Sequence, residues 1–502
     1  MKTFIFLLIS LIFYEAFSKT AEEWKSRVIY QIMTDRFSKT EESDIACSDL
    51  NNYCGGTFKG IERNLDYIQG LGVNAIWISP IQRNAEGAYH GYGVINFYEV
   101  NEHFGTEQDF KDLVKACHDR DIWIMVDVVA NHVGFVQPAD KAHETENNDY
   151  SKVVPFNDAK YYHPFKIECH YAEEVMDDPE PILETCWLCY LPDLNQSIPF
   201  VRNTLLEWVN WLVKTYDIDG LRLDALRHIN KGFWEEFSKS AGVFTVGEIW
   251  STNIEYAAGY QTCVDSVLNF PLQENLNQTF SQEKPLTLLS DYYKEANIKW
   301  KDISVLANFL DCHDKPRFLS HNNDVPSFKA ALSFTICSIG IPTIYYGNEQ
   351  GFIGGEEPRN RESLWPHLDK NHEMYKFIKT LTEFRIKTEF YKFEQIERLA
   401  DYDFYAFTRG KYFFAYSNSL ETVSREITNH PYEDQTWLCN AFNRDDCIQV
   451  NNLKFTVSIA NKDSKILFPK SIEDDKKSVA SKIWDQIKNE CGMALVSSSS
   501  FK

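Results

Sequence analysis

The stretch at residues 122–132 reads IWIMVDVVANH, an apolar run that predicts a buried β-strand and that ends in polar, hydrogen-bonding side chains. Three later stretches share this design, at residues 220–228 (GLRLDALRH), 244–250 (FTVGEIW) and 305–314 (VLANFLDCHD). A carboxylate at the end of a buried strand loses its hydration, so it needs either a partner or a chemical task. Four such strand ends in one chain predict a shared pocket at the carboxyl-end rim of a parallel barrel.

Strand-like and helix-like segments alternate through most of the chain. Amphipathic helical patterns, for example at residues 61–71 and 200–216, each precede an apolar strand-like run. This alternation is typical of a parallel α/β sheet, and eight units predict a (β/α)8 TIM barrel. The eight strands are expected at residues 28–37, 73–80, 122–129, 221–223, 244–249, 267–270, 305–310 and 343–346.

The barrel is expected to carry an insertion and a second domain. Residues 133–190 contain prolines and acidic pairs but no periodicity, which predicts an inserted B domain after the third strand. Residues 390–470 contain short period-2 runs, which predict a C-terminal antiparallel β-sandwich. These runs lie at residues 402–408, 412–417, 454–459 and 465–468. The barrel itself is then expected over residues 19–132 and 191–389, with residues 471–502 as a polar tail that holds at most one short helix.

The first 18 residues are typical of a secretory signal peptide. Lys2 supplies the positive start, residues 4–14 form a short apolar core, and Ala16 and Ser18 are the small residues before cleavage. This core is too short to span a bilayer, which needs about 20 apolar residues. We therefore expect secretion to the medium or to the lumen of a digestive compartment, with no membrane attachment after cleavage. We also expect a monomer.

The charge of the chain restricts its partners. The sequence holds 73 acidic and 51 basic residues, for a net charge of −22. This balance argues against nucleic acids and anionic membranes and favours a neutral or cationic ligand.

The 12 cysteines fit an oxidising compartment. Two pairs bracket turn-rich loops and suit local disulfides, Cys47 with Cys54 and Cys439 with Cys447. Two further cysteines lie in apolar helical stretches and are expected to be buried thiols, Cys117 and Cys337. A last group is open between disulfide pairing, which secretion favours, and a zinc cluster: Cys169, Cys186 and Cys189 with His163 and His170.

Three carboxylates at the strand ends suit the cleavage of a glycosidic bond. Such cleavage needs a proton donor and a group that stabilises an oxocarbenium-like transition state. Asp224 follows Arg222 by two residues, so both side chains lie on one face of the strand, and the guanidinium would keep a nucleophile ionised. Glu248 lies among apolar neighbours, which suits an acid/base with a raised pKa, and Asp314 could bind sugar hydroxyls and stabilise positive charge. The alternative for each position is a structural ion pair.

Other chemistries fit the sequence less well. The GFIGG stretch at residues 351–355 lacks the Lys-Ser/Thr ending of a nucleotide-binding loop, and no Gly-x-Ser-x-Gly elbow of a serine hydrolase is present. A hard cation is compatible with the oxygen donors Asn131, Glu184 and Asp193, which are of the type that Ca²⁺ binds. A solvated acidic loop is the alternative interpretation of these residues.

Four of the quoted segments, DVVANH, GLRLDALRH, GEIW and CHDKPRF, resemble the ordered motifs of the α-amylase family, glycoside hydrolase family 13. Further matches are YHGY at residues 89–92, LPDLN at 191–195 and NRESLW at 360–365. The resemblance spans residues 24–470 and is nearest to secreted fungal-type members. It implies a (β/α)8 barrel, a calcium-bearing B domain, a C-terminal β-sandwich and hydrolysis of internal α-1,4 bonds of starch or glycogen with retention.

The resemblance also implies roles by motif position. Asp224 would be the nucleophile, Glu248 the acid/base and Asp314 the stabiliser of the transition state. The substrate would be bound by Tyr92, His132, Arg222, Arg227, His228, His313 and Arg361. The ligands of Ca²⁺ would be Asn131, Glu184, Asp193 and the main-chain oxygen of His228.

Four positions depart from the fungal-type pattern. Asn195 stands where that pattern has a second aspartate, Gly93 replaces a tryptophan of the sugar platform, Glu357 replaces an aspartate, and Arg227 replaces a lysine. The first two leave open an exo-acting α-glucosidase or oligo-1,6-glucosidase of the same family. A non-catalytic binding module on this fold is a third possibility, but the three carboxylates and Arg222 are all present.

Overall fold

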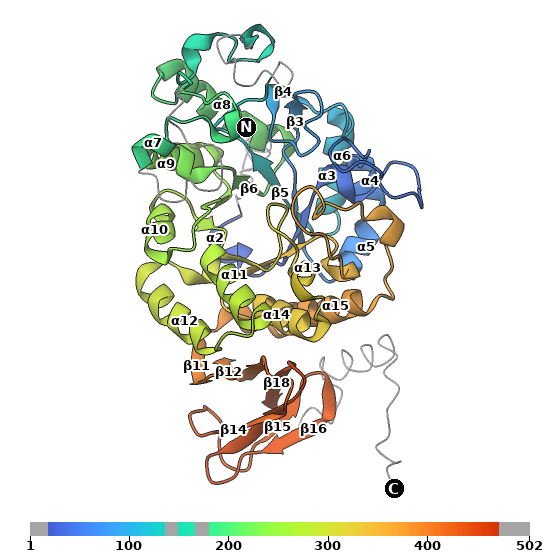
Figure 1. The fold of residues 1–502 in the computed structure, drawn as a ribbon, viewed down its shortest axis with the longest axis vertical. Helices are drawn as coiled ribbons and strands as arrows, with labels where there is room; N and C mark the ends of the chain where they lie inside the picture. The colour runs from blue at the N-terminus through green and yellow to red at the C-terminus, as the bar shows by residue number, and fades with distance from the viewer. Residues whose placement is uncertain (1–18, 136–148, 166–179, 471–502) are drawn as a thin grey trace, which may run out of the picture.

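The computed structural model of the protein describes residues 19–135, 149–165 and 180–470 (Figure 1). The expected signal peptide, the expected tail with its short helix, and Cys169 and His170 lie outside the described residues. No helix among the described residues is long and apolar enough to cross a membrane. The division of the chain into domains at residues 133, 191 and 390 stays a prediction.

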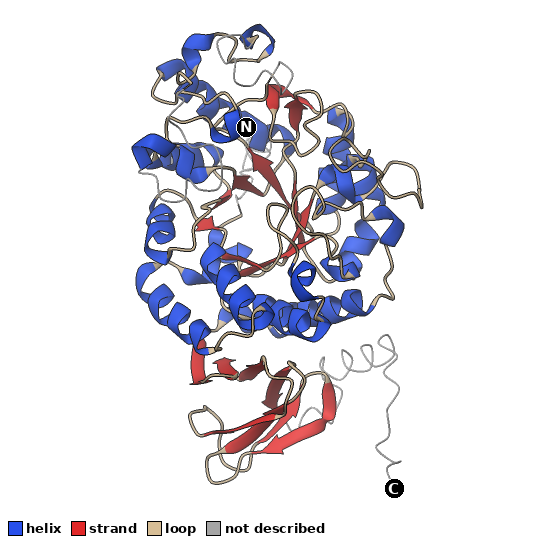
Figure 2. Cartoon of the chain, viewed as in Figure 1, coloured by secondary structure: helices blue, strands red, loops and turns tan. Residues whose placement is uncertain are grey.

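Eight parallel strands form one sheet at the centre of the described chain, and helices surround it (Figure 2). Their order in space is β8-β7-β6-β5-β2-β1-β10-β9, and a parallel bridge from Leu268 to Ala307 joins the two outer strands. The predicted TIM barrel is confirmed. The strands are β1 (Ile29–Ile32), β2 (Ala75–Ile78), β5 (Trp123–Val128), β6 (Gly220–Leu223), β7 (Phe244–Gly247), β8 (Ser266–Val267), β9 (Ala307–Phe309) and β10 (Ile341–Tyr345).

Alternate residues of these strands enter two different cores. Trp123 and Met125 of β5 pack in the barrel interior, whereas Ile124 and Val126 pack against the surrounding helices. The same parity sends Asp127, two residues beyond Met125, into the interior. Side chains at the carboxyl ends of the strands can therefore meet over the barrel axis.

The helices form where one apolar stripe meets a capping residue. In α6 the Thr106 hydroxyl and the Asp109 carboxylate form a capping box, and four buried residues at helical spacing form the stripe. The helices of the described chain are α2 (Ala21–Trp24), α3 (Thr34–Phe37), α4 (Phe58–Arg63), α5 (Leu65–Gly70), α6 (Glu107–His118), α7 (Glu180–Leu183), α8 (Pro199–Tyr216), α9 (Lys231–Ala241), α10 (Ile254–Ala258), α11 (Phe270–Leu276), α12 (Thr287–Lys299), α13 (Phe318–Asn322), α14 (Val325–Cys337) and α15 (Glu373–Thr388).

Most of the predicted strands extend beyond the observed ones, and two of them end for a clear local reason. The run at residues 28–37 is strand only to Ile32, and the short helix α3 follows it. Asp35 of α3 accepts hydrogen bonds from the backbone N–H groups of Cys54 and Gly55, which stabilises this turn. The run at residues 267–270 ends early because the Asn269 side chain caps α11. The helical pattern at residues 61–71 likewise divides at Asn64 into α4 and α5.

A separate antiparallel sheet follows the barrel, below it in Figure 1. Six strands pair in the order β11-β12-β13-β18-β15-β16, the pair β14-β17 lies apart, and both groups share one hydrophobic core. The predicted runs coincide with β12, β13, β17 and β18, whereas β11, β14, β15 and β16 were missed. The strands are β11 (Gln395–Ala400), β12 (Phe404–Arg409), β13 (Tyr412–Ser417), β14 (Val423–Ile427), β15 (Trp437–Asn440), β16 (Asn443–Gln449), β17 (Phe455–Ile459) and β18 (Ser464–Pro469).

The cysteines behave mainly as predicted. Both local disulfides, Cys47–Cys54 and Cys439–Cys447, are present, and the second joins β15 to β16. Cys117 and Cys337 are buried free thiols. Cys186 is also disulfide-bonded, so the zinc cluster that would have used its thiolate is wrong. Cys189 is a free, exposed thiol.

Candidate active site

Arg222 lies at the centre of a group of carboxylates over the barrel axis. Its Nη1 atom lies 2.9 and 3.1 Å from the two carboxylate oxygens of Asp127 and 2.6 Å from Asp224 Oδ1. Its Nη2 atom lies 2.8 Å from Glu248 Oε1. The guanidinium is fully buried, so this charge is balanced by these carboxylates and not by water. The structure thus brings together two of the three predicted catalytic residues through one predicted binding residue.

Strand order and register produce this arrangement. In the β5-β6 ladder Asp127 is the direct partner of Arg222, and β6 in turn pairs with β7. Asp224 and Glu248 each follow the end of their strand and have the parity of the inward-facing residues. Neighbouring parallel strands therefore place these side chains side by side at one rim.

Asp127 is the site residue that sequence reasoning missed. Its carboxylate accepts hydrogen bonds from the Tyr92 hydroxyl at 2.8 Å and from Trp77 Nε1 at 3.2 Å, besides those from Arg222. Burial raises its pKa, and the Arg222 guanidinium opposes that shift. The sequence feature that could have identified Asp127 is its position as a carboxylate inside the apolar run IWIMVDVV.

Glu248 and Asp224 have unlike environments. Burial raises the pKa of Glu248, the charges of Asp224 and Asp314 add to the rise, and Arg222 only partly offsets it. Glu248 Oε2 also accepts a hydrogen bond from the backbone of Ala225 at 3.1 Å. Asp224 Oδ1 lies 2.6 Å from Arg222 Nη1. The raised pKa of Glu248 suits a group that holds a proton.

Asp314 faces a second pair of polar groups. Arg361 Nη2 donates to its Oδ1 at 3.2 Å, and His313 Nε2 lies 3.1 Å from its Oδ2. Burial alone would raise the pKa of Asp314, but His313 and the Arg361 guanidinium outweigh burial and hold the pKa below its ordinary value. Arg361 is itself positioned by the His313 carbonyl, by the Tyr89 hydroxyl and by an ion pair with Glu357.

His313 and Tyr92 form a stacked pair beside these carboxylates. Their rings are 5.5 Å apart and inclined by 6°, and the Tyr92 hydroxyl lies 2.9 Å from His313 Nε2. Gln31 Nε2 donates to His313 Nδ1 at 2.7 Å, so the ring proton is assigned to Nε2. Burial lowers the pKa of His313 to about 3, so the ring is neutral at pH 7. His132 Nε2 donates to the Tyr92 carbonyl at 3.1 Å, so a third ring lies beside Tyr92 and His313.

Arg227 and His228 lie at the edge of this group. Arg227 donates at 3.0 Å to the carbonyl of Trp250, two residues after Glu248, and lies over the Tyr256 ring. The His228 ring contacts the carbonyl of Leu183, so it is held against the insertion and not against the carboxylates.

The predicted metal ligands fall into two parts. Asn131 and Asp193 lie on adjacent backbones, because Leu194 N donates to Asn131 O at 2.8 Å and Asp193 pairs with His132. Glu184 lies 3.5 Å from Asn230 Nδ2, in the segment that follows α7 and packs on residues 226–228. Asn131 Oδ1 is buried without a protein hydrogen-bond partner among the described residues, as an oxygen that binds a cation would be. Within the same residues no group of three His, Cys, Asp or Glu side chains is close enough to bind a metal.

Two of the unusual positions have local structural explanations. The Asn195 amide oxygen accepts hydrogen bonds from Ser197, in the turn that leads into α8. At Gly93 a Cβ atom would meet Ala88 Cβ at 2.9 Å, and a Cβ atom at Gly134 would meet the Gly93 carbonyl at 2.3 Å. The close approach of these two loops therefore requires glycine at both positions and leaves no space for a platform tryptophan.

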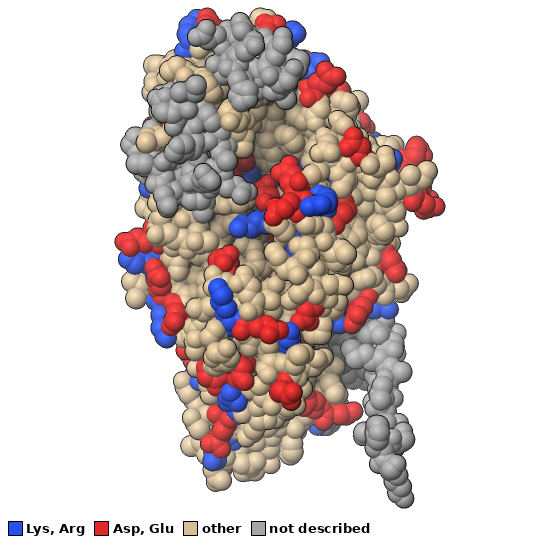
Figure 3. Space-filling model, in the orientation of Figure 1, with Lys and Arg blue, Asp and Glu red and all other residues tan. Residues whose placement is uncertain are grey.

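The molecular surface is hollowed on one face. In the upper half of the view in Figure 3 a depression opens, and acidic and basic side chains gather beside it. The acidic excess of the chain is spread over the same face, which is compatible with a neutral ligand.

Comparisons with known proteins identify the family of the chain. The family model "Alpha amylase, catalytic domain" matches residues 31–388. Alpha-amylase 2 of Schizosaccharomyces pombe is 41% identical over 382 residues, which are 73% of this chain and 64% of that protein. An alpha-amylase of Saccharomycopsis fibuligera is 38% identical, over 71% of this chain and 73% of its own. The chain spans less than two thirds of two S. pombe relatives, alpha-amylases 2 and 1.

Solved structures agree with the sequence relatives. An alpha-amylase from Malbranchea cinnamomea superimposes with a TM-score of 0.84 at 32% identity, over 90% of this chain and 97% of that one. An alpha-amylase from Geobacillus thermoleovorans in complex with acarbose gives a TM-score of 0.78 at 29% identity, over 89% and 99% of the two chains. With the family model matching most of the barrel, the chain belongs to the α-amylase family of glycoside hydrolases.

Proposed function

We propose that the protein is a retaining, endo-acting α-amylase that hydrolyses internal α-1,4-glucosidic bonds of starch or glycogen. The observation that supports this most strongly is the contact of one buried guanidinium, Arg222, with both Asp224 and Glu248. Retaining glycosidases need two carboxyl groups about 5–5.5 Å apart, whereas inverting enzymes separate them by about 6.5–9.5 Å. Two carboxylates bound to neighbouring nitrogens of one guanidinium favour the shorter separation.

The proposed reaction has two displacements. The Asp224 carboxylate, in contact with Arg222, attacks the anomeric carbon while Glu248 donates its proton to the leaving glycosidic oxygen. Water then attacks the glycosyl-enzyme ester, and Glu248 takes the proton from that water, so atoms and charge balance. Asp314, ionised beside Arg361, stabilises positive charge on the sugar ring in both transition states.

The remaining polar residues are proposed to hold the sugar. Tyr92 would stack on the reacting sugar ring, and its own stacking on His313 would hold it in place. His132, His313 and Arg361 are proposed to contact the sugar hydroxyls, because His313 and Arg361 both contact Asp314 and His132 contacts the backbone of Tyr92. Arg227 and His228 are proposed to line the side of the leaving group, Arg227 beside the Trp250 backbone and His228 against Leu183.

Calcium is proposed as a structural ion. The unpartnered, buried oxygen of Asn131 and the donor type of Glu184 and Asp193 fit a hard cation, together with the main-chain oxygen of His228. When bound, the ion would supply charge neutralisation and rigidity and no chemical step. Bound there, it would stabilise the segment after α7 and the residues that follow β5, among them His132, which is proposed to contact the substrate.

Secretion and a monomeric state are proposed from the sequence and the disulfides. The two complete disulfides suit an oxidising compartment. The proposed destination is the medium or the lumen of a digestive compartment, with α-glucan as the partner and no nucleic acid or membrane.

A second candidate is an exo-acting α-glucosidase or oligo-1,6-glucosidase of the same family. It is favoured by Gly93, where the packing leaves no platform tryptophan for a long chain. The test is chromatography of the products of soluble starch over time. An early spread of maltose and longer oligosaccharides supports the endo-amylase. Glucose as the only early product supports the second candidate, and no product at all contradicts both.

A further inference from the structure

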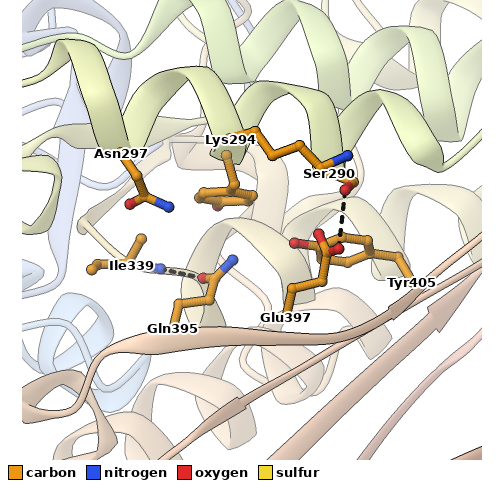
Figure 4. Close-up of a pocket in the computed structure, with 8 residues that line it drawn as sticks. Ser290, Lys294, Asn297, Ile339, Gln395, Glu397 and Tyr405 are labelled. Carbon is orange, nitrogen blue, oxygen red and sulfur yellow. Dashed lines mark hydrogen bonds between the residues drawn. The ribbon is translucent and has the colours of Figure 1, made fainter. Parts of the chain in front are cut away.

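The Gln31 side chain of β1 makes one hydrogen bond among the described residues, to the ring of His313. Gln31 is 3% exposed, its Nε2 atom lies 2.7 Å from His313 Nδ1, and its Oε1 atom is buried without a partner. The Gln395 amide, by contrast, is held by the backbone, because its Oε1 accepts from Ile339 N at 2.8 Å between the barrel and the C-terminal sheet (Figure 4). The Gln31 amide contacts the His313 ring and no backbone group.

The hydrogen bonds beyond His313 run in one direction. The Nε2 atom of the ring lies 2.9 Å from the Tyr92 hydroxyl, which lies 2.8 Å from Asp127 Oδ2. The Trp77 indole and the Arg222 guanidinium also contact this carboxylate and can only donate, so Asp127 acts as the acceptor. Burial raises the pKa of Tyr92 well above its ordinary value, so the hydroxyl keeps its single proton and uses it in the bond to Asp127. The Tyr92 oxygen is then left to accept from His313 Nε2.

This direction requires a proton on Nε2 of His313 and none on Nδ1. The ring is neutral because burial lowers the pKa of His313 to about 3, and a neutral imidazole carries one proton. A bare Nδ1 needs a donor, and the Gln31 amide is the donor at that position. In the other tautomer Nε2 would be an acceptor and would compete with Asp127 for the Tyr92 proton. Gln31 and Asp127, at opposite ends of this series, therefore favour the same tautomer.

The tautomer decides what the His313 ring presents to Asp314. His313 Nε2 lies 3.1 Å from Asp314 Oδ2, and Arg361 Nη2 donates to the other oxygen of this carboxylate at 3.2 Å. A proton on Nε2 stabilises the ionised carboxylate beside it. A proton on Nδ1 would instead turn the Nε2 lone pair toward a carboxylate oxygen, and the two would repel each other. The placement of one ring proton thus affects the group that is proposed to stabilise positive charge on the sugar.

We infer that Gln31 is a positioning residue, which keeps the ring proton of His313 on Nε2. A hydrogen-bond donor is thereby held beside Asp314 and Tyr92. Gln31 contacts none of the three proposed catalytic carboxylates and acts through His313. Its effect on the reaction rests on the proposed function, whereas its effect on the tautomer does not.

The experiment compares the parent protein with Gln31→Met, in which a thioether of similar length replaces the amide and cannot donate. Nitrogen NMR of the full chain labelled with ¹⁵N-histidine, without substrate, reports which ring nitrogen of His313 carries the proton, and His313→Gln identifies its signals. The parent is expected to show Nε2–H alone, and Gln31→Met to show Nδ1–H as well. Because the donor beside Asp314 is then partly lost, kcat on soluble starch is expected to fall about threefold to tenfold, the range of one hydrogen bond.

Two further variants show that the effect comes from Gln31. Gln261→Met makes the same exchange at a buried glutamine in the turn before β8, where the amide pairs with the backbone of Asp302, and it should change neither the tautomer nor kcat. Tyr92→Phe removes the hydroxyl on the other side of the ring and should leave the proton on Nε2, because the Gln31 amide still donates to Nδ1.

The outcomes separate this inference from the proposed function. Nε2–H alone in Gln31→Met, or Nδ1–H in the parent, overturns the inference. Loss of Nε2–H in Tyr92→Phe also overturns it, because the tautomer would then depend on the tyrosine. A changed tautomer with unchanged kcat overturns the effect on the reaction. A parent protein that does not hydrolyse starch contradicts the proposed function, and the tautomer measurement, which needs no substrate, still decides whether Gln31 positions the ring proton.

Discussion

Arg222 donates to both oxygens of Asp127, at 2.9 and 3.1 Å, across two neighbouring strands of the barrel. The pair is fully buried, and the same guanidinium contacts Asp224 and Glu248. Asp127 therefore fixes the position of the group that holds the two proposed catalytic carboxylates. It touches no substrate in the proposed mechanism and acts as a positioning residue.

Asp127→Asn tests that positioning role. The amide keeps the shape but leaves the Arg222 charge with one fewer counterion, and a buried pair that loses a partner costs about 3–5 kcal/mol. We expect a loss of stability toward the lower end of that range, measured by denaturant unfolding. We also expect kcat to fall about 100-fold because Arg222 shifts. Asp66→Asn, at an exposed carboxylate paired with Arg120, is the control and should stay within about 0.5 kcal/mol of the parent. Full activity in Asp127→Asn would contradict the role.

Glu248→Gln tests the acid/base. Removal of the proton donor should lower kcat on starch by about 10²–10⁴-fold, the usual contribution of general acid–base catalysis. Binding of maltose, measured by calorimetry, should persist because the amide still accepts hydrogen bonds. Glu235→Gln, on the exposed face of α9, should leave kcat unchanged. Near-normal turnover in Glu248→Gln would assign the proton transfer to another group.

The pH dependence follows from the raised pKa of Glu248. Burial and the neighbouring carboxylates raise it to about 8, so the acid form is present at neutral pH and is lost as the pH rises through that value. We expect kcat/KM to fall on the alkaline side near pH 8. The proton is bound more tightly in the folded state, so this group's stabilisation is complete below its unfolded pKa of about 4.5 and disappears as the pH rises through about 8. Glu248→Gln should therefore unfold at a higher temperature than the parent at pH 8 but not at pH 4, and identical melting curves at pH 8 would contradict the shift.

Chelation tests the proposed calcium. An ion present at about 100 times its Kd stabilises the folded state by about 2.7 kcal/mol, so a chelator should lower the melting temperature and added Ca²⁺ should restore it. Asn131→Ala should lose most of this response, because it removes the buried oxygen without a protein partner. Asn371→Ala, at an exposed asparagine, should respond like the parent. A melting temperature that changes with neither chelator nor added Ca²⁺ would exclude the proposed calcium site.

Arg409 joins the C-terminal sheet to the barrel. This buried arginine of β12 donates to the carbonyls of Ser338 at 2.8 Å, Tyr391 at 2.9 Å and Phe393 at 3.0 Å. Arg409→Met would leave these carbonyls without a partner, at a cost of about 1–3 kcal/mol each where water cannot reach them. We expect a clear loss in unfolding free energy, with Arg398→Met on β11 as a partly exposed control. Equal stability of the two variants would show that the junction does not depend on Arg409.

Local pattern was sufficient for the barrel strands. Runs such as IWIMVDVV and VLANF are almost entirely apolar because both faces of a barrel strand are buried, and all eight strands overlap the predicted runs. Strand β16 was missed because its sequence, NRDDCIQ, has neither an apolar run nor alternation. It is held by pairing with β15 and by the Cys439–Cys447 disulfide, which are contacts with residues earlier in the chain.

The sequence by itself determined the barrel and the two local disulfides, and it placed the three proposed catalytic carboxylates at strand ends, because each of these features lies within a short run of neighbouring residues. Only the tertiary structure decided the central position of Asp127 and the local hydrogen bonds of Asn195. Asp127 and Arg222 are separated by 95 residues. The register of one strand against another, which depends on packing throughout the barrel, brings such pairs together, and no local pattern encodes it.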